Sequence, residues 1–129
     1  MSIYKDLILD HYRHPRNFGR LKKRTSTVFV SNPLCGDEIK LDVQIQKDRV
    51  VGIKFDAEGC AISIASASLL SEYVKNKPTE ELHKLDSAFI IKLLGITLSP
   101  NRIKCALLPL EALTKIINSL KSINGKHKS

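Results

Sequence analysis

Two runs of alternating apolar residues, separated by a short polar turn, constrain the fold more than any other feature of the sequence. Every second residue is apolar in 38–46 and again in 51–57, at Ile39, Leu41, Val43 and Ile45 and then at Val51, Ile53, Phe55 and Ala57. Such alternation predicts strands with one apolar and one polar face. Lys47-Asp48 predicts a turn between them, and the β-rich residues 25–31 predict a third strand. We therefore expect a three-stranded antiparallel sheet with one solvated face.

The apolar face of this sheet requires helices to cover it, and helical patterns both precede and follow the strands. Helices are expected at 4–12 before His14-Pro15, at 61–74, from Pro78-Thr79 with Thr79 as N-cap, at 86–94 before Gly95, and along the stripe Leu113, Ile116, Ile117 and Leu120. The small residues of 61–68 predict tight packing of their helix on the sheet. The 129 residues suffice for one core. We predict a single α+β domain over residues 1–121 and a flexible basic tail over 122–129.

The start of the last helix depends on two signals. Ser99-Pro100 is typical of an N-cap followed by proline at the first helical position. Pro109, however, is expected only in the first turn of a helix, because its ring clashes with the carbonyl four residues earlier. This second signal predicts a helix that starts near residue 106, with Cys105 at its entrance.

Charge and composition narrow the classes of function. The net charge is +8, with a net +5 in residues 1–31, a net +4 in 114–129 and −1 between them. No aromatic-studded basic stripe accompanies this charge, so we expect solvated ends or a surface for an acidic protein rather than nucleic-acid binding. The most apolar stretch, 87–98, is too short to span a membrane. No signal peptide is recognisable, and three cysteines do not suggest a disulfide framework, so we expect a cytoplasmic protein.

All three cysteines are predicted at boundaries of secondary structure. Cys35 lies in a turn with Gly36 and Asp37, and Cys60 follows Gly59 where a strand meets a helix. A lone cysteine is usually a small buried apolar residue. Three thiolates in such settings, two of them at predicted helix N-termini, together with one carboxylate make a four-ligand set for Zn²⁺ or an iron–sulfur cluster. The neighbouring Lys104 could favour the thiolate form of Cys105. His11 and His14 are weaker candidates for metal ligands, since neither lies near a cysteine in the sequence.

Four segments resemble the U-type iron–sulfur cluster assembly scaffolds, the IscU/SufU/NifU N-terminal family. They are YKDLILDHYRHPRNFG (4–19), NPLCGDEIKL (32–41), FDAEGCAISIASAS (55–68) and RIKCALLPLEAL (102–113). The resemblance implies a three-stranded sheet backed by helices. It implies that Cys35, Asp37, Cys60 and Cys105 converge at an exposed edge and hold zinc or a transient [2Fe–2S] cluster. The implied partners are a cysteine desulfurase, an iron donor and acceptor apoproteins.

The sequence departs from the family pattern in ways that leave two functions open. Arg102-Ile103-Lys104-Cys105 is SufU-like, because IscU-type members have histidine where Lys104 stands, whereas the chain lacks a SufU-type insertion and has an IscU-like length. One reading is a cluster scaffold. The other is a zinc-dependent sulfur acceptor for a cysteine desulfurase, with Cys35 as the acceptor candidate and Cys105 as the alternative. Only Leu98 and Pro100 match the string that docks an Hsp70 chaperone, which weakens the expectation of such docking.

The sequence gives less support to two further classes of function. A structural zinc domain that binds a partner would unfold when zinc is removed and would accept no sulfur. A Cys–His hydrolase is disfavoured, because the cysteines have no context typical of such enzymes. We therefore expect a scaffold or sulfur acceptor rather than an enzyme that turns over a small substrate.

Overall fold

The computed structural model describes residues 3–33 and 36–128, and side chains within 5–120; Cys35 lies outside the described residues. The strands are β1 (Ser26–Asn32), β2 (Asp37–Gln46) and β3 (Arg49–Glu58), and they form one antiparallel sheet in that order. The helices are α1 (Ile3–Arg13), α2 (Ala61–Val74), α3 (Thr79–Leu82), α4 (Ser87–Leu94) and α5 (Pro100–Lys128). The predicted α+β class and three-stranded antiparallel sheet are thus confirmed. No helix of the described chain combines the length and the apolar character needed to cross a bilayer.

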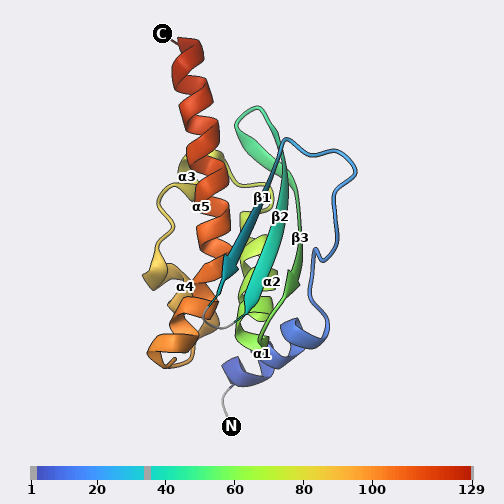
Figure 1. The fold of residues 1–129 in the computed structure, drawn as a ribbon, viewed down its shortest axis with the longest axis vertical. Helices are drawn as coiled ribbons and strands as arrows, with labels where there is room; N and C mark the ends of the chain where they lie inside the picture. Colours follow the sequence, from blue (N-terminus) through green and yellow to red (C-terminus); the bar gives the residue numbers. More distant parts are fainter. Residues whose placement is uncertain (1–2, 34–35, 129) are drawn as a thin grey trace.

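The helices form a second layer on the apolar face of the sheet. α2 packs against β3, α5 packs against β1 and β2, and α2 and α5 contact each other. α1 lies outside this pair against α2, and α4 lies outside it against both α5 and α2. α1, the start of β2 and the first turns of α5 lie at one end of the molecule, and the β2–β3 turn lies at the other (Figure 1). This arrangement brings segments that are far apart in the sequence to a common end of the sheet.

The β2–β3 hairpin contains an irregularity that the alternation pattern did not reveal. Lys47 and Asp48 form the predicted turn with positive φ angles of 53° and 61°. The register then shifts at Gln44/Ile45, so that Ile45 pairs with Val50 and Val51 has no partner in the ladder. Val50 is fully buried and Val51 only half-buried. The bulge thus interrupts the alternation that placed Val51 on the apolar face, and Val50 is the buried residue at this point of the strand.

The ends of the short helices follow local rules with one exception. Asp86 caps α4 by accepting a hydrogen bond from the Phe89 N–H at 2.9 Å, and Gly95 ends that helix at a φ of 71°. Thr79, in contrast, is the first residue of α3, and Pro78 occupies the N-cap position. The Thr79 N–H donates to the Asp48 carbonyl at 2.8 Å. The prediction of Thr79 as the N-cap was therefore wrong, and a hydrogen bond to a distant residue holds Thr79 in position instead.

The predicted start of α5 near residue 106 was also wrong. α5 begins at Pro100, where the Ser99 hydroxyl accepts a hydrogen bond from the Arg102 N–H at 3.4 Å, and Pro109 lies inside the helix. Pro109 has no N–H to donate to the Cys105 carbonyl one turn earlier, which normally costs about 3 kcal/mol. The helix nevertheless continues, because its apolar stripe is buried in the core at Leu113, Ile116 and Ile117. Its backbone stays helical to Lys128, and the flexibility of 122–129 remains a prediction.

Helix α2 is lined by small residues because it packs closely against other elements. Its four serines, Ser63, Ser66, Ser68 and Ser71, are all buried. The Ser66 hydroxyl donates to the Ala106 carbonyl of α5 at 2.7 Å, and Ser68 shares a 2.7 Å hydrogen bond with His11 of α1. Each hydroxyl is therefore satisfied while the helix backbones approach closely. The interpretation of 61–68 as packing residues is confirmed.

Candidate metal and cluster site

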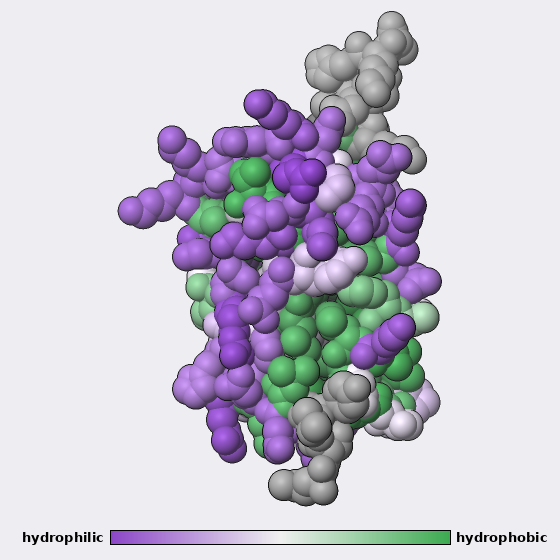
Figure 2. Space-filling model, turned by 180° about the vertical axis from the view of Figure 1, so that it is seen from behind, coloured by the Kyte–Doolittle hydropathy of each residue, from purple (hydrophilic) through white to green (hydrophobic). Residues whose placement is uncertain are grey.

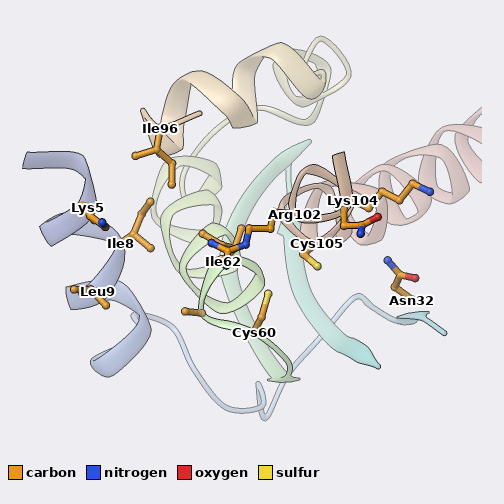
Figure 3. A pocket seen from close by; sticks show the side chains of 12 residues that line it. Lys5, Ile8, Leu9, Asn32, Cys60, Ile62, Ile96, Arg102, Lys104 and Cys105 are labelled. Atoms are coloured by element: carbon orange, nitrogen blue, oxygen red, sulfur yellow. The ribbon is translucent and has the colours of Figure 1, made fainter. Parts of the chain in front are cut away.

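Three of the four predicted ligands meet at one end of the sheet. One ligand atom from each of Asp37, Cys60 and Cys105 lies within 4.8 Å of the others. Asp37 is the first residue of β2, Cys60 immediately precedes α2, and Cys105 lies in the second turn of α5. The two sulfur atoms point toward a shared space (Figure 3). Cys35, the fourth predicted ligand, lies outside the described residues.

The Asp37 carboxylate is held by the backbone that leads into α2. Its Oδ1 accepts a hydrogen bond from the Cys60 N–H at 3.0 Å, and the Cys60 thiol lies 3.5 Å from its Oδ2. Gly59 makes this approach possible, because a Cβ at that position would lie 2.6 Å from Asp37 Oδ1 and 2.6 Å from Ser63 Oγ. No side chain larger than hydrogen fits between these atoms. The glycine before the second cysteine is thus required by space.

Cys60 and Cys105 differ in their surroundings. Cys60 is exposed and is the N-cap residue of α2. Cys105 is buried, with 6% of its surface exposed. Because α5 begins at Pro100, Cys105 is not at the helix entrance that we expected. Its place in the site comes instead from the packing of α5 against α2, where Ser66 bonds the neighbouring Ala106 carbonyl.

The other predicted site residues lie apart from the ligand atoms. Lys104 is exposed, and its side chain extends away from both sulfur atoms (Figure 3). Its role as a thiolate activator remains a prediction. His11 is buried between α1 and α2, where Ser68 holds its Nδ1, and burial lowers the pKa of its ring. His14 is exposed beyond the end of α1. In the described chain, neither histidine belongs to the cluster of metal-ligand atoms.

The donor set fits both zinc and iron. Two thiolates and one carboxylate are ligands that Zn²⁺ uses at tetrahedral sites, where two sulfur atoms on one ion lie about 3.8 Å apart. The separation of up to 4.8 Å here requires only a small closure. Thiolates also hold iron–sulfur clusters, and a carboxylate is a harder ligand that binds soft iron less firmly. The chemistry of these three donor atoms is therefore compatible with either kind of site.

A pocket of about 650 Å³ opens beside the two cysteines, and the sequence did not predict it. Its apolar wall consists of Ile8, Leu9, Ile62 and Ile96, and its cations are Lys5, Arg102 and Lys104. Seen from behind, the molecule shows an apolar area over its lower half, at the end where α1 and the start of α5 lie (Figure 2). No sequence signal joins α1 to the cysteines, because only the packing of α1 on α2 places it there.

The fold and the donor set define a class of protein, namely a small α+β domain with a group of metal-ligand atoms at one end of its sheet. A family model described as the NifU-like N terminal domain matches residues 3–127. The chain therefore belongs to the NifU-like N-terminal domain family, as the sequence resemblance predicted.

Relatives of both predicted kinds are similar to the chain. The zinc-dependent sulfurtransferase SufU of Bacillus subtilis is 37% identical over 131 aligned positions, which cover 88% of this chain and 88% of that protein. The iron–sulfur cluster assembly scaffold protein IscU of Rickettsia prowazekii is 36% identical over 122 residues, 92% of each chain. A crystal structure of a nitrogen-fixing NifU-like protein (N-terminal) from Brucella abortus has a TM-score of 0.76 at 19% identity. It covers 93% of this chain and 95% of that one, and it shows the shared fold.

Proposed function

We propose that the protein is an iron–sulfur cluster assembly scaffold. It accepts sulfur from a cysteine desulfurase, takes up iron, assembles a transient [2Fe–2S] cluster and passes it to acceptor apoproteins. The observation that carries this proposal is the meeting of Asp37, Cys60 and Cys105 within 4.8 Å at one end of the sheet. Cys35 lies two residues before Asp37 in the sequence and is the fourth ligand in the proposal.

The described residues suit a cargo that has to be released. Cys60 is exposed and so gives iron and sulfur access to the site, whereas the buried Cys105 anchors one side of it. The Asp37 carboxylate is the weakest of the three ligands toward iron, and the Cys60 N–H keeps it in place. A site with one weak ligand retains the cluster less firmly than a site of four thiolates, which favours its transfer.

The test is anaerobic reconstitution with ferrous iron, cysteine and a cysteine desulfurase, followed by absorption spectroscopy. We expect a visible [2Fe–2S] spectrum for the wild-type chain and its loss in Cys60→Ser. Asp37→Ala should still form a cluster. The time for which the chain retains this cluster should differ from that of wild type, because the weak ligand is gone. Asp56→Ala, an exposed aspartate on β3, is the matched control and should behave as wild type. Absence of any cluster spectrum in the wild-type chain would contradict the scaffold.

The zinc-dependent sulfurtransferase is the second candidate, and two specific observations favour it. The Arg102-x-Lys104-Cys105 string is SufU-like, and the Bacillus subtilis relative is named a zinc-dependent sulfurtransferase. This function predicts tight zinc binding and faster turnover of the desulfurase when the zinc-loaded chain is added. Cys35→Ser should abolish that stimulation. Unchanged stimulation in this variant would exclude Cys35 as the sulfur acceptor.

A further inference from the structure

We propose that the pocket beside the cysteines binds a small carboxylated thiol, with Arg102 holding its carboxylate and its sulfur facing Cys60 and Cys105. The thiol would remove sulfur that the protein carries on one of these cysteines. This inference rests on the proposed function, because it requires that sulfur reaches the site. It adds a binding site for a small molecule next to the site for the metal or cluster.

The charge of the pocket favours an anion. Lys5, Arg102 and Lys104 line it, and none of the described residues that line it is acidic. Asp37 touches Cys60 but does not line the pocket. Within the described chain, none of the three cations forms a salt bridge, whereas Arg16 and Arg20 pair with aspartates. Positive charge without a partner beside a hollow surface attracts and retains an anionic ligand.

Arg102 is the cation best placed to hold a carboxylate over the sulfur atoms. Its side chain extends from α5 toward the α2 side of the pocket, whereas Lys104 extends away from the cysteines (Figure 3). A guanidinium group can donate two parallel hydrogen bonds to one carboxylate, which orients the ligand as well as binding it. Arg102 would thus be the residue that selects carboxylated thiols over neutral ones.

The size and the wall of the pocket fit a small molecule. A volume of about 650 Å³ lies within the range of about 300–1,000 Å³ that is typical of small-molecule sites. Ile8, Leu9, Ile62 and Ile96 offer an apolar surface to the carbon chain of a ligand. With a cation at one side and two thiols at another, the pocket matches a ligand whose anionic group and sulfur are separated by a short aliphatic chain. Thiol amino acids and short thiol peptides have this form.

The chemistry is a sulfur transfer that requires no oxidant or reductant. The thiolate of the ligand attacks the outer sulfur of a protein persulfide and forms a new S–S bond. The bond between the outer sulfur and the cysteine Sγ breaks, and its electron pair stays on Sγ. The cysteine is thereby restored as a thiolate, and the ligand leaves as its own persulfide. One S–S bond forms for the one that breaks.

The test measures discharge of sulfur from the purified full chain. The chain is loaded with inorganic polysulfide or with a desulfurase and cysteine, desalted, and mixed with 3-mercaptopropionate or with the neutral 2-mercaptoethanol. For wild type we expect the discharge rate to saturate as the concentration of 3-mercaptopropionate rises. With 2-mercaptoethanol the rate should rise linearly with concentration. Arg102→Gln should lower kcat/KM for 3-mercaptopropionate about 10-fold, the effect of losing a charged hydrogen-bond donor, and leave the 2-mercaptoethanol rate unchanged. Arg102→Lys should restore part of the loss.

The controls separate this proposal from the function on which it rests. Arg13→Gln removes an exposed arginine of α1 that does not line the pocket, and it should leave both rates unchanged. Equal slowing of both thiols by Arg102→Gln, or no slowing, would overturn the proposal. Slower loading from the desulfurase with unchanged discharge would also overturn it and would assign the cations to protein docking. Failure of the desulfurase to load the wild-type chain would contradict the proposed function, while polysulfide loading would still test the pocket.

Discussion

Strand β2 carries two buried aspartates that have different roles. Asp37 and Asp42 are five residues apart, so their side chains lie on opposite faces of the sheet. Both are nearly inaccessible, with 3% and 0% of their surface exposed. Asp37 faces the helices and contacts Cys60, whereas Asp42 lies on the face that the alternation pattern assigned to solvent. The expectation that this face of the sheet is solvated was wrong at Asp42.

The difference lies in the groups that surround each carboxylate. Asp42 accepts hydrogen bonds from Arg20 at 2.7 Å, from the Thr27 hydroxyl at 2.7 Å and from the Leu21 N–H at 3.0 Å. Burial alone would raise the pKa of Asp42, but these bonds outweigh it and lower the pKa to about 2. Asp42 therefore fastens the segment before β1 to the sheet. A buried carboxylate held by arginines stabilises the fold, whereas one placed beside thiols can serve a metal.

The largest effect is expected from Asp42→Ala. The substitution removes the acceptor for donors of four residues, Arg20, Leu21, Arg24 and Thr27, and leaves both arginines without their partner. It should lower the free energy of unfolding by about 3 kcal/mol. Urea denaturation followed by circular dichroism measures this change. Zinc affinity of the folded fraction should be unaffected, because Asp42 lies on the opposite face from the cysteines. Asp56→Ala on the exposed surface of β3 is the control, and an equal shift in both variants would contradict the structural role of Asp42.

Gly59→Ala tests the position of Asp37, the other aspartate of the comparison. The added Cβ would displace the Asp37 carboxylate, so zinc affinity should fall about 10- to 100-fold, as when a supporting group of a metal site is lost. Competition with a chromophoric chelator measures the affinity. Gly52→Ala is the matched control, since a Cβ there meets its nearest atoms at 3.5 Å, an ordinary contact. Equal affinities of the two variants would show that the approach of Asp37 to Gly59 does not position this ligand.

Acid titration of the folded chain tests the role of Asp42 in a second way, and the expected change in the free energy of unfolding is smaller. The pKa of Asp42 lies near 2 in the folded chain and at 3.8 ordinarily, so the unfolded chain binds the extra proton first. The stabilisation, about 2 kcal/mol, is present above pH 4 and disappears as the pH falls from about 4 to about 2. Unfolding measured across this window should show a weaker pH dependence in Asp42→Ala than in wild type. The same slope in both chains would assign the acid sensitivity to other groups.

Much of the fold could be predicted because the signals are local. The strand and helix patterns, the Lys47-Asp48 turn and the Gly95 helix end depend on neighbours within a few residues. Val51, Thr79 and Pro109 depart from these local patterns because their outcomes depend on distant partners: a bulge in the β2–β3 ladder, a bond to the Asp48 carbonyl, and the burial of α5. In each case tertiary packing overrode a local preference.

By itself, the sequence determined the chemistry of the site: which residues can bind metal, the placement of Asp37 and Cys60 at element boundaries, and the glycine that precedes Cys60. Residue type and backbone propensity decide these features. Only the tertiary structure decided that Asp42 is buried on the polar face of the sheet, how Cys105 reaches the other ligands from within α5, and that α1 completes an apolar pocket with Arg102 at its side. Those outcomes arise from contacts between segments up to a hundred residues apart, which the packing of helices on the sheet creates and no local pattern records.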